Sequence, residues 1–135
     1  MVDIRQVLYP KEFLNKRILT HPKQEGELRD ILEKSGCEQE FVRLFVVRYK
    51  HIGRYWEECI NKRDWFEILK STKGIYSMKF KHRSKNLRTL FKFVCFRGNR
   101  TAVLLHSFEE KRSKDYRTAI KVASQRLEEL GGLFN

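Results

Sequence analysis

The chain has 135 residues, 41% of them hydrophobic and 13% aromatic, which excludes a disordered chain and predicts a domain that buries a core without disulfides or metals. Its three cysteines are odd in number and widely spaced, so neither a disulfide framework nor a zinc site is expected. No apolar run has the length of a membrane span and the first residues lack the apolar core of a signal peptide, so we expect a soluble, cytoplasmic protein without a membrane partner.

The formal net charge of +12 is concentrated in the second half of the chain. Residues 1–70 contain 14 Lys or Arg and 12 Asp or Glu, whereas residues 71–135 contain 15 and 5. Such an asymmetry indicates that the second half binds nucleic acid or an acidic partner. A basic surface that only keeps the protein in solution is the alternative at this point.

Residues 1–70 have the pattern of a helical leader. Pro10 is placed like a first-turn proline, Pro22 interrupts the segment that follows it, and Gly36 is placed like a left-handed helix terminator. The apolar spacing predicts four helical segments, over about 10–19, 24–34, 38–51 and 64–69.

Residues 75–108 have the pattern of an antiparallel meander. Alternating residues predict strands over about 76–81, 88–96 and 101–108, with turns at 84–86 and 98–99. Between Lys79 and Arg100 there are eight Lys or Arg and no Asp or Glu. Because successive strand residues point to opposite sides, we expect one apolar and one cationic face, with Lys79, Arg88 and Lys92 on the cationic one.

A last helix is expected over about 114–130, because apolar residues recur there at intervals of four and three before a Gly-Gly pair. N-terminal helices, a small antiparallel sheet and a closing helix make an α+β fold. We expect one domain over 1–135, in which 1–70 is the helical leader and 71–135 holds the basic sheet and the closing helix.

The sequence contains no Gly-rich phosphate loop, metal-spaced Cys pair, His-Glu helix motif or Ser nucleophile elbow. Its carboxylates are not clustered as a two-metal nuclease centre requires, so no metal or cofactor is predicted. A set of Lys, Arg and His can cleave RNA without a metal. One group removes the 2′-hydroxyl proton, cations stabilise the charge on phosphate, and another group protonates the leaving oxygen. This chemistry requires RNA, because DNA has no 2′-hydroxyl.

Four parts of the second half resemble the phage-derived, HigB-like branch of the RelE/ParE toxin superfamily. They are GIYSMKF at 74–80, NLRTLF at 86–91, LLHSFEEK at 104–111, and the set Ala119, Ala123 and Arg126. The resemblance covers about 65–130. It implies a RelE-like fold and the toxin of a type II toxin–antitoxin system. It further implies an mRNA interferase, an endoribonuclease that acts on the ribosome and has a cognate antitoxin protein as partner.

The basic strands and the resemblance together give the candidate site residues. Arg88, Lys79 and Lys92 are expected to contact phosphate and stabilise the transition state. His106 is expected to be either an acid/base group or a packed core residue. Four further cations are expected to bind RNA: Lys81, Arg83, Lys85 and Lys111.

Two classes of function remain open. The first is the mRNA endonuclease, which Arg88, His106 and Lys111 favour. The second is a non-cleaving protein of the same fold, either a gyrase inhibitor or a phage-derived nucleic-acid-binding protein. The family commonly has Arg where this chain has Lys79, a difference that keeps the charge but loses the bidentate fork and favours the second class.

Overall fold

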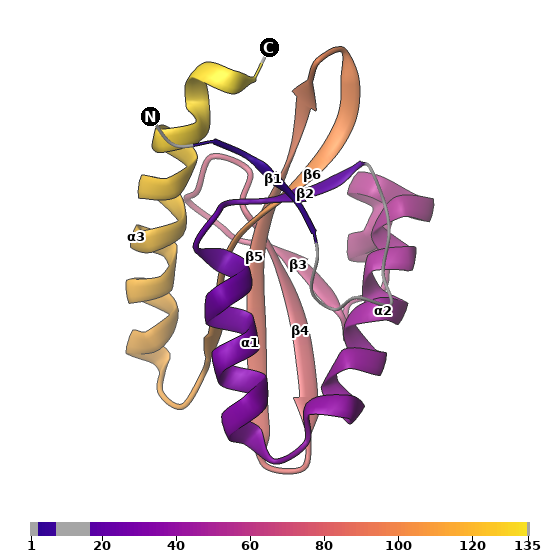
Figure 1. The fold of residues 1–135 in the computed structure, drawn as a ribbon, viewed down its shortest axis with the longest axis vertical. Helices are drawn as coiled ribbons and strands as arrows, with labels where there is room; N and C mark the ends of the chain where they lie inside the picture. The colour runs from indigo at the N-terminus through magenta and orange to yellow at the C-terminus, as the bar shows by residue number, and fades with distance from the viewer. Residues whose placement is uncertain (1–2, 8–16, 135) are drawn as a thin grey trace.

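The computed structural model describes residues 3–7 and 17–134, which form an α+β fold (Figure 1). The elements are β1 (Arg5–Gln6), β2 (Ile18–Thr20), α1 (Gln24–Ser35), α2 (Glu38–Tyr55), the 3-10 helix η1 (Trp56–Asn61), β3 (Phe66–Ile68), β4 (Tyr76–His82), β5 (Lys85–Phe96), β6 (Asn99–Glu109), α3 (Ser113–Leu130) and the 3-10 helix η2 (Gly131–Leu133). No helix in these residues is long and apolar enough to cross a membrane.

The strands form one mixed sheet in the order β1-β2-β6-β5-β4-β3. β2 runs parallel to β6, and all other neighbouring pairs are antiparallel. The meander predicted from the sequence is therefore confirmed as β4-β5-β6. Its two turns lie slightly earlier than expected, because His82 pairs with Lys85 and Phe96 with Asn99.

The predicted placement of helices in the first half is wrong at two points. Ile18 and Leu19, expected in a first helix, lie in β2 and pair with Ala102 and Val103; the part of that helix over 10–16 falls outside the described residues. The segment expected as a short helix over 64–69 contains β3, which extends the sheet beside β4. In each segment only three residues pair, too few for the sequence to distinguish a period of two from one of 3.6.

Helices cover both faces of the sheet, so the expected division into one apolar and one cationic face is also wrong. On one face, α1 and α2 enclose the larger core, where Phe41 and Phe45 pack with Phe80 and Phe91. On the other face α3 covers a second core, with apolar side chains from the middle of the sheet: Ile75, Leu90, Val103 and Leu105. The Lys and Arg side chains of this second face lie at its margins.

Candidate functional site

Lys79 and Arg88 are direct cross-strand partners in the β4–β5 hairpin. Both lie on the face that α3 covers, at the margin where α3 begins, because Tyr116 in its first turn packs edge-on against Phe108, the β6 partner of Arg88. A pocket of about 490 Å³ opens beside this pair. We call it the cationic pocket; it is lined by Arg48, Asp64, Trp65, Lys79, Lys81, Asn86 and Arg88.

Arg48 reaches the cationic pocket from α2, in the opposite helical layer. β3 pairs with β4 only as far as Met78, so the carbonyl of Lys79 lies at a free edge, where it accepts a hydrogen bond of 2.8 Å from Arg48 Nε. The guanidinium lies 4.4 Å from the ring centroid of Trp65 and 5.1 Å from that of Phe80. The aromatic rings and the Lys79 carbonyl therefore hold this arginine at the pocket wall.

Arg48 is only 6% exposed and forms no ion pair with any carboxylate of the described residues. Burial lowers the pKa of Arg48 to about 10, so the side chain is still charged at neutral pH. A buried charge is normally paired, since leaving water is costly for an ion. A nine-tenths buried arginine that lines a pocket and has no described carboxylate partner can bind an anion there.

Arg88 is held more firmly than its neighbours. Its Nη2 donates to Glu110 Oε1 at 2.9 Å, and its guanidinium lies 5.8 Å from the ring centroid of Tyr116. Burial raises the pKa of Tyr116 to about 12, and the hydroxyl is hydrogen-bonded to Ser77 and donates to Glu67. The neutral phenol and the carboxylate together fix the position of Arg88.

Of the other expected cations, the structure brings only Lys81 into the cationic pocket. Lys85 lies 3.9 Å from Glu109, and Arg83 and Lys111 are exposed in the β4–β5 turn and in the loop before α3. These three surround the same end of the sheet without lining the pocket.

Lys92 shares the face of Lys79 and Arg88 but lies elsewhere on it. It is four residues beyond Arg88 on β5, about 13 Å along the strand. Its Nζ donates to the carbonyl of Lys73, and it lines a different pocket, with Cys95 and Arg100. The structure therefore does not bring Lys92 together with the Lys79–Arg88 pair.

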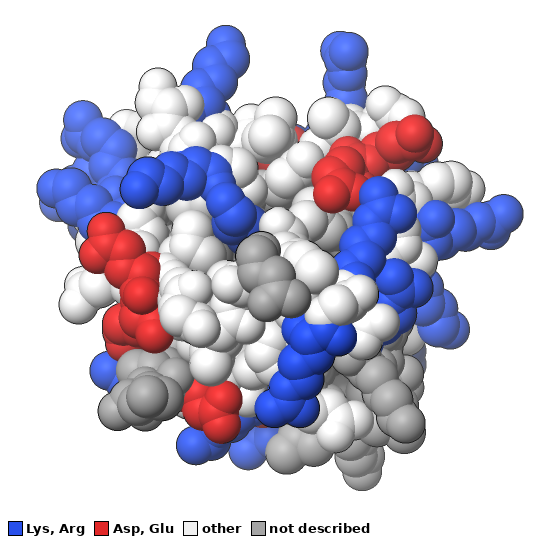
Figure 2. All heavy atoms as spheres, turned by 90° about the horizontal axis from the view of Figure 1, so that it is seen from above, with Lys and Arg blue, Asp and Glu red and all other residues white. Residues whose placement is uncertain are grey.

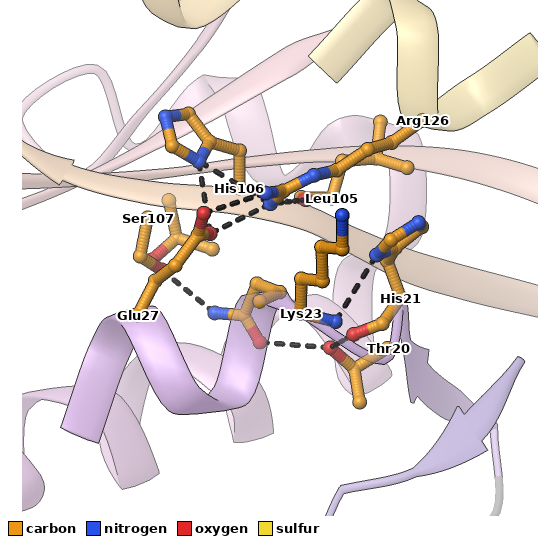
Figure 3. Close-up of polar contacts among 10 residues, drawn as sticks. Thr20, His21, Lys23, Glu27, Leu105, His106, Ser107 and Arg126 are labelled. Carbon is orange, nitrogen blue, oxygen red and sulfur yellow. Dashed lines mark hydrogen bonds and ion pairs between the residues drawn. The ribbon is translucent and has the colours of Figure 1, made fainter. Parts of the chain in front are cut away.

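His106 belongs to a second charged cluster at the edge of β6, which we call the edge network: Glu27, His106 and Arg126 (Figure 3). Glu27 of α1 accepts bonds of 2.6 Å from both terminal nitrogens of Arg126 of α3, and its Oε1 lies 2.9 Å from His106 Nδ1. Arg126 also donates to the Leu105 carbonyl at 2.9 Å. The network joins α1, β6 and α3.

The charge of Glu27 is stabilised by its partners. Burial alone would raise the pKa of Glu27, but the hydrogen bonds and charges of His106 and Arg126 outweigh it and lower that pKa to about 2. A register shift opposite Leu90 and Phe91 leaves Leu105 unpaired in β6, so Leu105 packs in the α3 core while His106 stacks on Phe108. His106 therefore lies outside the cationic pocket.

Sequence reasoning missed Arg48, the most deeply buried cation of the pocket. A signal was present, because Arg48 falls on the apolar stripe of α2 formed by Phe41, Phe45 and Ile52. A charge at such a position is either paired inside the fold or reserved for a ligand. Asn86 and Trp65, which also line the pocket, carried no comparable signal.

Basic side chains are not confined to the pocket. Figure 2 shows the end of the molecule at the top of Figure 1, where Lys and Arg project around an uncharged centre with Asp and Glu between them. Arg100, near the start of β6, pairs with Glu57 of η1 at 2.7 Å. No group of three or more His, Cys, Asp or Glu that could hold a metal ion occurs in the part of the chain that the structure describes.

The family model for "Phage derived protein Gp49-like (DUF891)" matches residues 45–128, which include every residue of the cationic pocket. Neither a curated protein nor a solved structure matches the chain. The matched segment spans more than half of the sequence and carries most of α2, the whole meander and most of α3. The chain belongs to the Gp49-like family of phage-derived proteins, which falls broadly among the RelE/HigB-like toxins.

Proposed function

We propose that this protein is the HigB-like toxin of a type II toxin–antitoxin system and that it cleaves mRNA at the cationic pocket, on the ribosome, in the cytoplasm. The observation that carries the proposal is Arg48, a buried cation without a carboxylate partner in the described residues, beside the paired Lys79 and Arg88. A phosphodiester supplies the negative charge that this arrangement lacks. Membership of the family supports the toxin assignment.

The pocket supports cleavage by attack of the RNA 2′-hydroxyl on the adjacent phosphorus. Charge grows on the phosphoryl oxygens in the transition state, and the fixed guanidinium groups of Arg48 and Arg88 stabilise it. A lysine ammonium, from Lys79 or Lys81, donates a proton to the leaving 5′-oxygen. The products are a 2′,3′-cyclic phosphate and a 5′-hydroxyl, and no step requires a metal.

The test is to induce the protein in cells and to map mRNA 5′ ends. New ends should appear within open reading frames, and Arg88→Ala should reduce their formation by about 10²-fold, as is typical when one transition-state contact is removed. Lys121→Ala is the matched control, because Lys121 is an exposed cation on α3 outside the pocket. Unchanged 5′ ends in cells that stop growing would reject cleavage.

The antitoxin is expected to be an acidic protein, since an anionic segment placed on the cationic pocket would compete with RNA. Co-expression with the product of the neighbouring gene should restore growth and give a complex that survives purification. Dissociation of that complex at high salt would indicate that charge provides most of the contact. If the two proteins do not co-purify, the pairing is wrong.

A second candidate is a protein of the same fold that binds nucleic acid or inhibits gyrase without cleaving RNA. The observation that favours it is the edge network, in which Glu27 and Arg126 hold His106 outside the pocket. Inhibition of gyrase supercoiling by purified protein, without new mRNA ends in cells, would select this candidate.

A further inference from the structure

We propose that Glu110 is the general base of the cleavage reaction, a role that rests on the proposed function. Glu110 follows β6 directly, and its carboxylate accepts the 2.9 Å hydrogen bond from Arg88 Nη2. Its backbone N–H donates to the carbonyl of Asn86 at 2.8 Å. Two residues of the cationic pocket therefore fix Glu110: the Arg88 side chain holds its carboxylate, and the Asn86 carbonyl holds its backbone.

The Arg88 guanidinium connects Glu110 to the position of a bound phosphate. Nη2 is used by Glu110, and Nε is buried with no partner in the described part of the chain. Nη1 and the second N–H of Nη2 remain for a phosphate entering the pocket. A carboxylate and a phosphate on neighbouring nitrogens of one guanidinium lie side by side, and the 2′-hydroxyl of a nucleotide is attached next to its 3′-phosphate. Glu110 thus lies where a base for that hydroxyl is needed.

In the reaction, the Glu110 carboxylate takes the proton of the 2′-hydroxyl as the 2′-oxygen forms a bond to phosphorus. The bond between phosphorus and the 5′-oxygen breaks, and that oxygen receives a proton from a pocket lysine. Proton and charge balance, because one proton is taken by a carboxylate and one is given by an ammonium. Exchange of a proton with water restores both groups.

Other carboxylates near the pocket fit this role less well. Asp64 lines the pocket but is exposed and forms no ion pair with any of its cations in the described residues. Glu109 points away to Lys85, at 3.9 Å. Glu27 is committed to the edge network. Among the carboxylates that the structure describes, only Glu110 combines a fixed side chain with a hydrogen bond to a pocket arginine.

The experiment compares Glu110→Gln with Glu109→Gln and Asp64→Asn in the full chain. Cleavage is measured as the rate of appearance of mapped 5′ ends on mRNA in a translation extract. Affinity is measured on an RNA oligonucleotide with 2′-O-methyl groups, which cannot react. We expect Glu110→Gln to lose about 10²-fold or more in rate while its affinity stays within a factor of about three, since glutamine still accepts the Arg88 hydrogen bond. Glu109→Gln, at the neighbouring carboxylate outside the cationic pocket, should retain the wild-type rate.

The outcomes separate this inference from the proposed function. If the wild-type protein produces no new ends, the proposed function fails and the general base fails with it. If the wild type cleaves and Glu110→Gln cleaves equally well or faster, cleavage stands and Glu110 is not the base. If Glu110→Gln loses affinity as well as rate, it only positions Arg88. Loss of rate in Asp64→Asn alone would move the role to Asp64.

Discussion

The cationic pocket and the edge network are both partly buried and charged, but they differ in whether their cations are paired with a carboxylate. In the edge network, one carboxylate holds Arg126 through two bonds of 2.6 Å and also contacts His106 at 2.9 Å. In the pocket, no described carboxylate lies within 4.0 Å of the charged nitrogens of Arg48, Lys79 or Lys81. Among the described residues, an acidic side chain pairs with Arg88 alone of these pocket cations.

The difference indicates which charged side chains stabilise the fold and which are available to bind a ligand. A buried ion that is compensated inside the protein stabilises the elements it joins once they are assembled, and removing its partner is destabilising. A buried ion left without a partner costs stability and is kept for another reason. Substitutions in the two clusters should therefore change different properties of the protein.

The largest effect is expected from Arg126→Met in the edge network. This change leaves Glu27 without its bidentate partner and removes the bond to the Leu105 carbonyl. We expect a loss of about 3 kcal/mol in the free energy of unfolding, measured by urea denaturation. Arg117→Met, the same substitution at an exposed position of α3, should change it by less than about 0.5 kcal/mol. Equal losses in the two variants would show that the edge network contributes no more to stability than an exposed arginine does.

Acid should weaken the edge network in a defined pH range. The pKa of Glu27 is about 2 in the folded protein, below its ordinary value of 4.5, so its contribution is complete above pH 4.5 and is lost as pH falls from 4.5 towards 2. The shift corresponds to roughly 3 kcal/mol, and about 2 kcal/mol is expected because Glu27 is partly exposed. The free energy of unfolding of Glu27→Gln should depend less on pH in this range than that of the wild type. Parallel curves would show that the network does not hold Glu27 ionised.

The fold could be predicted from the sequence wherever a pattern was long enough to have a period. The meander over 76–109 and the helices near 24–35, 38–55 and 113–130 were found for that reason. β2 and β3 were missed because the partners of a three-residue strand, not its own sequence, decide its conformation. That helices cover both sheet faces was not predicted. The second face has basic residues at its margins, which led to the expectation of a cationic face although its centre is apolar.

The candidate site could be predicted only in part. Strand alternation predicted Lys79, Arg88 and Lys92 on one face, and the structure lines one pocket with Lys79 and Arg88, together with Lys81, but not with Lys92. Arg48 lies on a helix, 31 residues before the Lys79 that it contacts. Alternation along the strands gives no information about contacts with a helix, so the role of Arg48 could not be predicted from it. The partners of His106 lie 79 and 20 residues away, at Glu27 and Arg126, which is why its environment could not be read from its neighbours in the chain.

Arg48→Met should have the opposite consequence to Arg126→Met. Replacing a buried charge with an apolar side chain of similar length is often neutral or stabilising, so the free energy of unfolding should stay equal or rise. The affinity for single-stranded RNA should fall about tenfold, and its dependence on salt should become shallower by about one released counterion. Filter binding at several salt concentrations measures both quantities. A strongly destabilised protein would place Arg48 with the structural charges and remove the main support for the pocket as a phosphate site.

Lys79→Arg gives the smallest effect and sharpens the assignment of roles inside the pocket. Arginine keeps the charge and presents a planar fork that binds phosphate through two hydrogen bonds, so RNA affinity should rise about two- to fivefold. The control, Lys50→Arg at an exposed position of α2, should leave the affinity unchanged.

The cleavage rate distinguishes two roles for Lys79. If Lys79 only stabilises charge, the rate should rise with the affinity. If its ammonium donates the proton to the leaving oxygen, the rate should fall although the affinity rises, because a guanidinium does not release its proton in proteins. Weaker binding by Lys79→Arg would mean that the pocket has no room for a fork beside Arg88, and that phosphate is held there by Arg48 and Arg88 without help from position 79.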